Sequence, residues 1–242
     1  MTQTLKGRTV VVTGGFGFLG GALAARLVKE GARVVLVDRS AVPAQALPDV
    51  ALALGGVDLG SPDSADAAFS RIAGELGGID ALVNVAGGFV WETVEAGSIE
   101  SWDRMYGMNL RTAVVASQAV LPHMLAKGAG RLVNVGALAA SKAATGMGAY
   151  AASKAGVARL TEALAEELKD KGVTVNAVLP SIIDTPTNRA DMPDADATRW
   201  VSADAAAVFA ALLLFGSRST FAAALAAGLL VTSPFEPLFD IA

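Results

Sequence analysis

The chain has 242 residues, a formal net charge of −4, one histidine and no cysteine. The lack of cysteine excludes disulfides and cysteine-based zinc sites. The single histidine, His123, argues against other metal sites and against nucleophiles of the Ser-His-Asp or Cys-His kind. No run of basic residues points to nucleic acid.

The length fits one domain over residues 1–242, because no Ser/Pro-rich linker divides the chain. The first residues lack the basic and apolar segments of a signal peptide. The apolar runs near the C-terminus are interrupted by residues 216–220 and are shorter than the ~20 residues that span a bilayer. We therefore expect a cytoplasmic protein with no membrane partner.

Short apolar runs alternate with longer helical patterns along the chain. The expected strands are Thr9–Thr13, Arg33–Val37, Gly56–Leu59, Ala81–Val85, Arg131–Val135, Val173–Leu179 and Leu229–Thr232, and the clearest helices are Gly20–Glu30, Ser101–Lys127 and Tyr150–Lys171. Several strands are apolar throughout, as expected when both sheet faces are covered. The alternation predicts an α/β fold with one Rossmann-type, doubly wound parallel sheet of about seven strands and helices on both faces. Ligands of such sheets bind at the carboxyl ends of the strands.

The first expected strand runs into a glycine turn. Gly14, Gly17 and Gly20 follow it and open a helix, an arrangement that lets a pyrophosphate approach the backbone at a helix N-terminus. Asp38 ends the next strand, where a carboxylate accepts the ribose hydroxyls of NAD. A 2′-phosphate would meet a like charge there, so we expect NAD (NADH) rather than NADP, a preference that Arg39 could soften.

Two further strand ends fall in the same crevice. Asp58, in the stretch GVDLG, could contact the adenine edge of a cofactor. The stretch VNVAGG, residues 83–88, ends a strand with glycines where the middle of a cofactor would pass. The alternative for both is a plain turn.

Tyr150 and Lys154 are four residues apart, which puts both side chains on one face of a helix. A phenol beside an ammonium suggests proton chemistry. A lysine charge ~4 Å away in an effective dielectric of ~20 is worth ~4 kcal/mol, or roughly three pKa units. We therefore expect Lys154 to lower the pKa of Tyr150 into the working range of an acid or base.

Two regions interrupt the alternation of strands and helices. Asp184–Trp200 is polar, contains prolines and follows a strand end, so we interpret it as a substrate lid, with Met192 and Trp200 as the apolar residues that would cover a substrate. Residues 233–242 form an aromatic and proline-rich tail that we expect to pack rather than to do chemistry.

Taken together, these motifs resemble the short-chain dehydrogenase/reductase family. The resemblance rests on the glycine turn at 13–20, NVAG at 84–87, Asn109, the Tyr150–Lys154 pair and NAVLP at 176–180, which span about three quarters of the chain. It implies an NAD(P)-dependent oxidoreductase of small molecules that forms a homodimer or homotetramer through its long helices. It also implies that Asn109 anchors a water relay behind Lys154, although a helix-bending or core amide is the alternative.

The chain departs from the family pattern at the position that usually holds a catalytic serine. Thirteen residues before Tyr150 stands Ala137, and the nearest hydroxyl, Ser141, lies four residues further along. Phe18 and Ser181 depart from the wider family as well. At these places the chain is similar to the quinonoid dihydropteridine reductases, which share the turn GGFGFLG, an alanine before the tyrosine and a lid like VLPSIIDTPTNRADMPDAD.

A physical argument connects Ala137 with such chemistry. Reduction of a ketone localises charge on one oxygen, which a serine stabilises, whereas reduction of a quinonoid imine spreads charge over a ring. We therefore expect hydride transfer to or from a small cyclic carbonyl or quinonoid substrate, with Tyr150 as the acid or base. One alternative is a ketone or alcohol dehydrogenase whose serine is replaced by Ala137, and another is a catalytically retired sensor or scaffold.

The residues expected at the site fall into three groups, and no metal is expected. Catalysis is assigned to Tyr150, Lys154, Asn109 and the Ala137 position; cofactor binding to Gly14, Phe16, Gly17, Phe18, Leu19, Gly20, Asp38, Asp58, Leu59, Asn84, Ala86, Gly87, Tyr150, Lys154, Pro180 and Ile183; and substrate contact to Met192 and Trp200.

Overall fold

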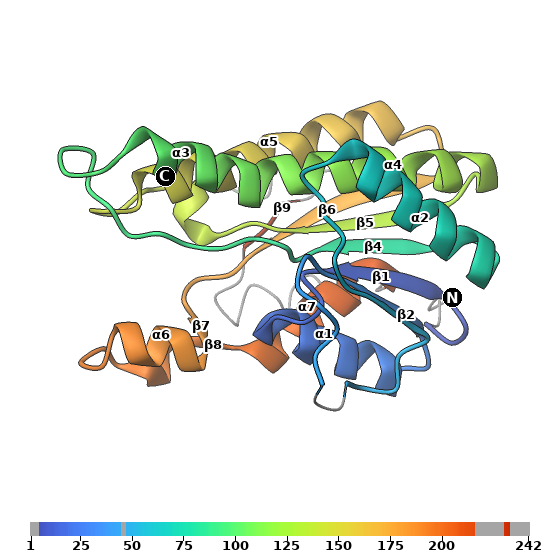
Figure 1. Cartoon of the computed structure of the whole chain (residues 1–242), viewed down its shortest axis with the longest axis horizontal. Helices are drawn as coiled ribbons and strands as arrows, with labels where there is room; N and C mark the ends of the chain where they lie inside the picture. Colours follow the sequence, from blue (N-terminus) through green and yellow to red (C-terminus); the bar gives the residue numbers. More distant parts are fainter. Residues whose placement is uncertain (1–4, 45–46, 216–229, 233–242) are drawn as a thin grey trace.

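A seven-stranded sheet with the order β3-β2-β1-β4-β5-β6-β9 forms the centre of the protein (Figure 1). The computed structural model describes residues 5–44, 47–215 and 230–232. The strands are β1 (Thr9–Thr13), β2 (Arg33–Val37), β3 (Leu52–Leu54), β4 (Ala81–Asn84), β5 (Gly130–Val135), β6 (Val173–Leu179) and β9 (Leu230–Thr232). The first six are parallel, and β9 runs antiparallel to β6. The expected doubly wound α/β fold is confirmed, except for the direction of this last strand.

Helices cover both faces of the sheet (Figure 1). On one face lie α2 (Pro62–Leu76), α4 (Thr112–Lys127) and α5 (Gly148–Leu168); on the other lie α1 (Phe18–Lys29) and α7 (Ala203–Phe215). Phe69 and Met124 are fully buried in the first core, and Leu27 and Leu214 in the second. Because both faces are buried, β1 and β4 have no exposed residue, which explains why apolar residues do not alternate with polar ones inside these strands.

The strand order reverses beside β1, which lies between β2 and β4. The chain moves outward through β2 and β3 and then returns to the other side of β1. In open α/β sheets this reversal creates a crevice at the carboxyl ends of the strands, where ligands bind. The residues that follow β1, β2, β4 and β5 therefore define the place to look for a site.

The predicted helix over Ser101–Lys127 is longer and less regular than expected. It comprises α3 (Ile99–Met105), a π-helical turn (Tyr106–Arg111) and α4. It begins before Ser101 because the Ser98 hydroxyl caps it, accepting a bond from the Ser101 amide at 3.3 Å. The π turn contains Asn109, and such turns often mark functional positions.

The strand expected over Gly56–Leu59 is wrong. Gly56 has a φ of 74°, a left-handed conformation that ends extended structure, and the Asp58 carboxylate accepts the Gly60 amide at 2.8 Å in a local turn. The strand lies earlier, at β3. Smaller differences concern ends: α1 starts before Gly20, and α5 spans Gly148–Leu168 instead of 150–171.

The predicted lid, Asp184–Trp200, is framed by a second, two-stranded sheet. β7 (Ile183–Asp184) pairs in parallel with β8 (Val201–Ser202), and α6 (Pro186–Asp191) and a short 3-10 helix (Ala197–Arg199) lie between them. In Figure 1, α6 projects away from the main sheet. The predicted tail, residues 233–242, and Leu229 of the last expected strand lie outside the described residues. None of the described helices is both long and apolar enough to cross a membrane.

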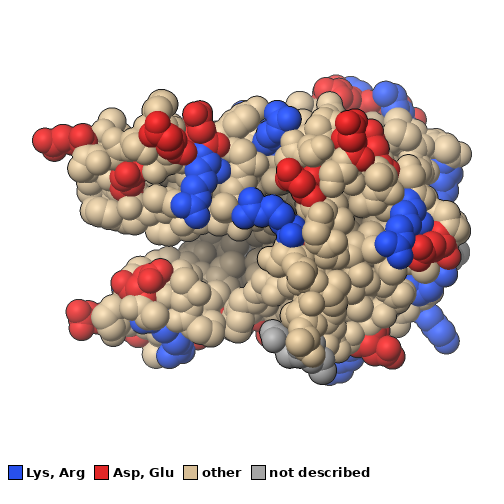
Figure 2. Space-filling model, in the orientation of Figure 1, with Lys and Arg blue, Asp and Glu red and all other residues tan. Residues whose placement is uncertain are grey.

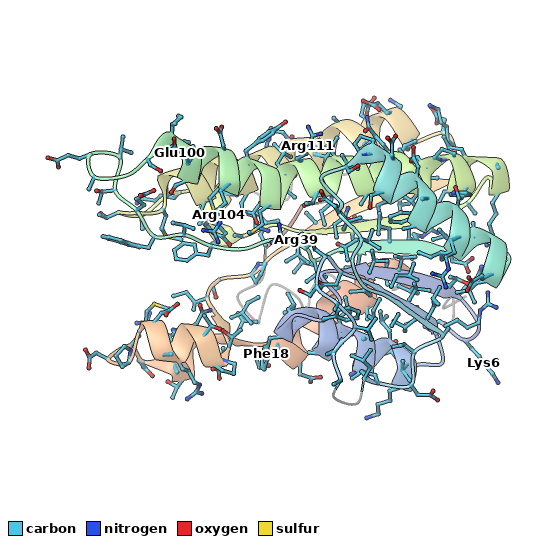
Figure 3. The ribbon with its side chains drawn as sticks, viewed as in Figure 1. Lys6, Phe18, Arg39, Glu100, Arg104 and Arg111 are labelled. Carbon is cyan, nitrogen blue, oxygen red and sulfur yellow. The ribbon has the colours of Figure 1, made fainter. Side chains whose placement is uncertain are left out.

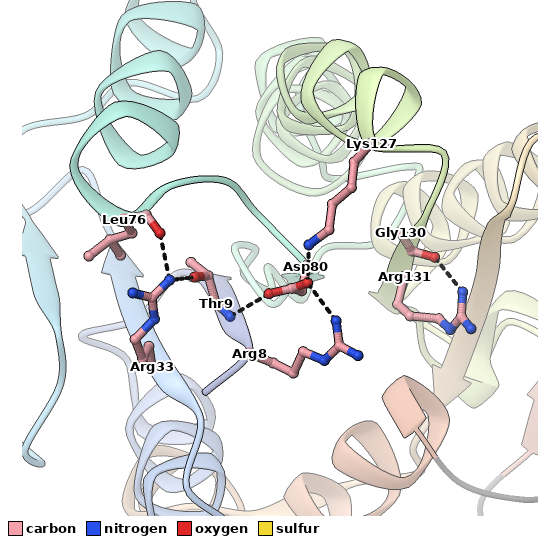
Figure 4. Close-up of polar contacts among 8 residues, drawn as sticks. All are labelled: Arg8, Thr9, Arg33, Leu76, Asp80, Lys127, Gly130 and Arg131. Carbon is pink, nitrogen blue, oxygen red and sulfur yellow. Dashed lines mark hydrogen bonds and ion pairs between the residues drawn. The ribbon is translucent and has the colours of Figure 1, made fainter. Parts of the chain in front are cut away.

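An ion cluster occupies the amino ends of the strands, opposite the crevice (Figure 4). Asp80 precedes β4, and its carboxylate accepts bonds from the Thr9 amide at 2.8 Å, from Arg8 at 3.1 Å and from Lys127. Burial opposes its ionisation, but the bonds from Lys127, Thr9 and Arg8 outweigh burial and hold the pKa of Asp80 below its usual value. The cluster ties β1, β4 and α4 together.

Candidate active site

The glycine turn after β1 is packed so tightly that side chains are excluded. A Cβ on Gly20 would lie 2.2 Å from the Gly14 carbonyl oxygen, and a Cβ on Gly14 would lie 2.8 Å from the Ala86 Cα. Gly14 also has a φ of 63°. Gly17 is the N-cap of α1 and has no side chain between the helix start and solvent. The turn is therefore a cradle of bare backbone at a helix N-terminus, which fits a pyrophosphate.

Gly15 belongs to this cradle but was missed by the sequence reasoning. A Cβ there would approach the Leu36 Cβ to 2.7 Å, so β2 packs directly on the turn. The G-x-x-G-x-x-G spacing does not include this position. A contact with Leu36, which is 21 residues further along the chain, leaves no mark in a local pattern.

Asp38, directly after β2, points its carboxylate at the glycine turn. One oxygen accepts the Phe16 amide at 3.1 Å, and the other accepts the Ser40 amide at 2.9 Å. These bonds fix the carboxylate beside the turn, where the sequence predicted that it would meet an adenosine ribose. Leu19, in the first turn of α1, is half-buried, and Phe18 beside it is 54% exposed.

Asp58 and Leu59 are neighbours, but Asp58 lies in a turn near the crevice and Leu59 lies in the core. Asp58 forms the turn described above, and the Arg111 guanidinium donates to the Gly60 carbonyl at 2.8 Å, which ties this turn to the π-helical segment. Leu59 is buried in the core between the sheet and α2, so its side chain faces away from the crevice. Only its backbone is left to contact a cofactor.

Thr13, the last residue of β1, holds the neighbouring strand end in place. Its hydroxyl accepts the amides of Val85 at 3.1 Å and Ala86 at 3.2 Å. These two bonds hold the residues that follow β4 against the end of β1, and they place Ala86 next to Gly14. This role of Thr13 could not be predicted from local sequence, because its partners lie 72 and 73 residues away.

Asn84 turns its side chain into the core and away from the crevice. Its amide donates to Asn134 on β5 at 2.9 Å and to Ser117 on α4 at 3.3 Å, and Asn134 donates to Thr161 on α5 at 2.9 Å. The Asn84 Oδ1 atom is buried without a hydrogen-bond partner among the described residues. The predicted cofactor contact of Asn84 would therefore involve its backbone.

Lys154 lies buried beneath the crevice, next to Asn109. Its ammonium donates to the Val135 carbonyl at 2.8 Å, and burial lowers its pKa to about 8. A Cβ on Gly87 would lie 2.5 Å from the Asn109 Oδ1 atom and 3.5 Å from the Lys154 nitrogen. The predicted residues Lys154, Asn109 and Gly87 thus meet in one place.

Asn109 joins three segments of the chain. Its side chain accepts the Gly88 amide at 2.9 Å and donates to the Gly88 carbonyl at 3.1 Å and to the Ser153 hydroxyl at 3.0 Å. Ser153 in turn donates to the Tyr150 carbonyl at 2.7 Å. Ser153 is buried, and it links Asn109 to the turn of α5 that carries Tyr150.

The pKa of Tyr150 moves in the direction opposite to the one expected from sequence. Burial raises the pKa of Tyr150 to about 12. The expected lowering by Lys154 is absent because desolvation dominates and the ammonium is directed at the Val135 carbonyl. The Phe89 ring meets the Tyr150 ring edge-on, with centroids 5.0 Å apart and an interplanar angle of 84°.

Ala137 sits where β5 leads into a short 3-10 helix, Leu138–Ala140. It is buried, with an extended backbone. The amides on either side, Gly136 and Leu138, donate at 2.9 Å to the carbonyls of Val178 and Pro180. The backbone of Ala137 is therefore held in place at the ends of β5 and β6, and its side chain is a methyl group in place of a hydroxyl. The nearest hydroxyl, on Ser141, is exposed to solvent.

Pro180 and Leu19 line a small apolar cavity of about 10 Å³ together with Val85, Val135 and alanines of α7. Ile183 lies at the base of the lid, where its carbonyl accepts the Asn188 side chain at 2.7 Å. Met192 and Trp200 are half-buried within the lid. No described contact joins either of them to Tyr150, so their proposed part in covering a substrate stays a prediction.

The crevice opens to solvent between the lid and the α3 end of the molecule. Figure 2 shows this hollow, with Lys and Arg side chains on one rim. Figure 3 labels Arg39 and Arg104 near its mouth and Phe18 on the opposite side. Among the described residues, no three His, Cys, Asp or Glu side chains gather in a way that could hold a metal ion.

Comparison with known proteins identifies the class to which this fold and site belong. The short chain dehydrogenase family profile matches residues 8–196, and the chain belongs to that family. One relative is the probable galactose dehydrogenase GalD of Rhizobium meliloti (strain 1021), which is 36% identical over 192 residues, covering 76% of this chain and 75% of that protein. The family binds a nicotinamide dinucleotide and carries out oxidoreduction.

Solved structures show the same fold. NAD+-bound xylitol dehydrogenase superimposes with a TM-score of 0.80 at 24% identity, covering 90% of this chain and 96% of that one. A short chain dehydrogenase from Burkholderia cenocepacia J2315 in complex with NADP has a TM-score of 0.76 at 33% identity, covering 88% and 92%. Both dinucleotides thus occur among the neighbours.

Proposed function

We propose that this protein is an NADH-dependent reductase that transfers a hydride to a small cyclic carbonyl or quinonoid substrate, with Tyr150 as the proton donor. A bound nicotinamide dinucleotide supplies the hydride. The observation that carries the proposal is the pinned, buried Ala137 at the usual serine position beside an intact set of Tyr150, Lys154 and Asn109.

The pKa directions support a role of Tyr150 as an acid. At neutral pH its phenol is protonated, because burial raises its pKa to about 12, so it carries a proton to give. Lys154, with its pKa lowered to about 8, is largely charged at pH 7 and can restore a proton. Asn109 and Ser153 hold the backbone of α5 so that the two side chains keep their places.

Ala137 supports a substrate that spreads its developing charge. A serine hydroxyl at this position would stabilise an oxyanion, and a donor aimed at such an oxyanion is worth roughly 10²–10³ in rate. A conjugated ring delocalises the charge over several atoms and gains less from one donor. A site with a methyl group there is suited to the second kind of acceptor.

NADH is proposed over NADPH because of Asp38. Its carboxylate is fixed beside the glycine turn by the amides of Phe16 and Ser40. An added 2′-phosphate would meet this negative charge and would replace the 2′-hydroxyl that could donate to it. Arg39 is exposed and forms no ion pair with a described residue, so it is the cation that would oppose this preference.

Dehydrogenation of an alcohol is the second candidate function. It is favoured by the 36% identity to a probable galactose dehydrogenase. In that case Tyr150 would accept a proton, and its raised pKa would oppose the step at neutral pH.

The proposal extends to the organisation of the chain. We propose that residues 1–242 act as one dinucleotide-binding domain, that Asp184–Trp200 closes over the substrate, and that two or four copies assemble through α4 and α5. We also propose a cytoplasmic location. The parallel β7–β8 pair supports lid closure about a fixed base, since it joins the two ends of the segment.

The experiment that tests the function is a panel of NADH oxidation assays with ketones, quinones and quinonoid dihydropterin. The proposal predicts the highest kcat/KM on the conjugated acceptors and loss of turnover in Tyr150→Phe. Higher activity in alcohol oxidation would favour the second candidate. Cofactor binding without turnover of any compound would identify a retired site.

A further inference from the structure

Large apolar side chains reach solvent between β4 and α3. Phe89 and Trp91 are 49% and 61% exposed, and Trp102 on α3 is 38% exposed. Clustered exposed apolar groups of this size commonly mark a binding surface. We call Phe89, Trp91 and Trp102 the aromatic wall.

The wall is seated on the loop that leads into Tyr150. The Glu92 amide donates to the Gly146 carbonyl at 2.9 Å. A Cβ on Gly146 would lie 2.2 Å from the Trp91 Cε2 atom, so the indole rests directly on bare backbone. Gly146 has a φ of 74°, which also favours glycine at this place. The position of Trp91 is therefore set by the same loop that begins α5.

The other two members contact the same stretch of chain. A Cβ on Gly148 would lie 3.4 Å from the Trp102 ring. Phe89 meets the Tyr150 ring itself at a centroid distance of 5.0 Å. The wall thus contacts residues 146, 148 and 150 in succession, so it lies along the segment that carries Tyr150.

We propose that the aromatic wall binds the ring of the substrate and that Trp91 selects planar conjugated rings over saturated ones, an inference that rests on the proposed function. Aromatic rings interact best with one another at centroid distances of roughly 4.5–7 Å, and a flat ring lying against Trp91 and Phe89 covers their exposed surface. A saturated ring is puckered and makes fewer such contacts. The polar groups that the wall offers are the two indole N–H groups, so hydroxyl-rich substrates gain little from it.

The test compares two acceptors with NADH as the donor: quinonoid dihydropterin, which is planar, and cyclohexanone, which is saturated. Trp91→Ala should lower kcat/KM for the pterin by about 30-fold, mainly through KM, as loss of a central aromatic contact does. Activity on cyclohexanone should change less than about threefold. Trp91→Phe keeps a ring in place and should retain most of the pterin activity.

Ile99→Ala is the matched control, because Ile99 is exposed on the same stretch and lies outside the wall. It should leave both activities unchanged. An equal loss on both acceptors in Trp91→Ala would overturn the inference, since it would mean that Trp91 only supports the loop before Tyr150. Unchanged pterin activity would overturn it as well. The affinity for NADH and the melting temperature show whether each variant is folded.

A binding measurement separates this inference from the proposed function. The chain has three tryptophans, so the double variant W102F/W200F keeps only Trp91. With NAD+ present, added pterin should quench Trp91 fluorescence saturably, even if the wild-type protein reduces neither acceptor and the proposed function fails. No saturable quenching would overturn the ring-binding subsite, whatever the activity.

Discussion

At the amino ends of the strands, Asp80 is surrounded by Arg8, Lys127 and the Thr9 amide (Figure 4), and its pKa is held low. At the carboxyl ends, Lys154 is buried without a carboxylate partner among the described residues, and its pKa is also lowered, which for a lysine disfavours its charge. One end satisfies a charge and gains stability. The other leaves the ammonium of Lys154 and the phenol of Tyr150 poorly solvated, which costs stability and shifts the pKa values of both groups.

The largest effect should follow removal of the phenol hydroxyl. Tyr150→Phe should lower kcat by about 10³-fold, because it removes the proposed proton donor, and should leave NADH affinity unchanged. Stopped-flow measurement of NADH oxidation and a fluorescence titration with NADH provide the two values. Near-normal turnover would mean that the proton comes from another group. The poor solvation of Tyr150 at the carboxyl ends of the strands would then have no part in the reaction.

Lys154→Met should change how stability depends on pH. Burial lowers the pKa of Lys154 from 10.5 to about 8, so between these values the unfolded chain binds a proton that the folded protein has lost. The free energy of unfolding should therefore rise with pH across this window, by roughly 3 kcal/mol in total. Urea denaturation at several pH values should show this slope in the wild type and lose it in Lys154→Met.

Lys171→Met is the control for that measurement, because Lys171 is exposed. The slope of stability against pH should be the same as in the wild type. Equal slopes in all three proteins would contradict the description of Lys154 as a buried, poorly solvated cation.

Asp80→Asn should lower stability without affecting catalysis. It removes the ionised partner of Lys127 and Arg8, which should cost about 2 kcal/mol, since both cations are partly exposed. Folding lowers the pKa of Asp80. Its contribution to stability is therefore complete at any pH above the ordinary pKa of an aspartate, and it is lost as the pH falls through the lowered pKa of the folded protein. Glu75→Gln, which breaks the exposed pair with Arg71, should cost less than about 0.5 kcal/mol.

The smallest effect concerns the cofactor. Asp38→Asn should reduce the proposed preference for NADH over NADPH by about tenfold, because the amide removes the charge that would repel a 2′-phosphate. Fluorescence titrations with both cofactors measure the ratio, and Asp66→Asn, at an exposed position on α2, serves as the control. An unchanged ratio would assign the preference to another group.

Local patterns predicted the parts of the site that depend on near neighbours in the chain. Gly14 and Asp38 directly follow strands, Gly20 lies in the first turn of α1, and the Tyr150–Lys154 spacing needs only a helix, so each could be located from sequence. The family resemblance added Asn109. These are positions where the backbone alone brings the groups into place.

Contacts between distant segments could not be read in this way. The buried position of Ser153 depends on Asn109, which is 44 residues away, and the pKa of Tyr150 depends on how deeply the packed helices bury it. The prediction of a strand at Gly56–Leu59 was wrong because Gly56 adopts a left-handed conformation that starts a turn. The apolar side chains of this turn still pack against the core. The antiparallel pairing of β9 with β6 could not be predicted either, because an apolar strand pattern does not encode the direction of the strand.

The most direct test of the account is the effect of Ala137→Ser on the ratio of ketone to quinonoid reduction. If the site serves a delocalised acceptor, the added hydroxyl should raise kcat on a simple ketone by roughly 10²–10³ and leave the rate on quinonoid dihydropterin almost unchanged. The measurement needs only kcat and KM for both substrates in the wild type and the variant. A gain of that size on both substrates would contradict the account, because it would show that the wild-type site lacks a serine that its chemistry requires.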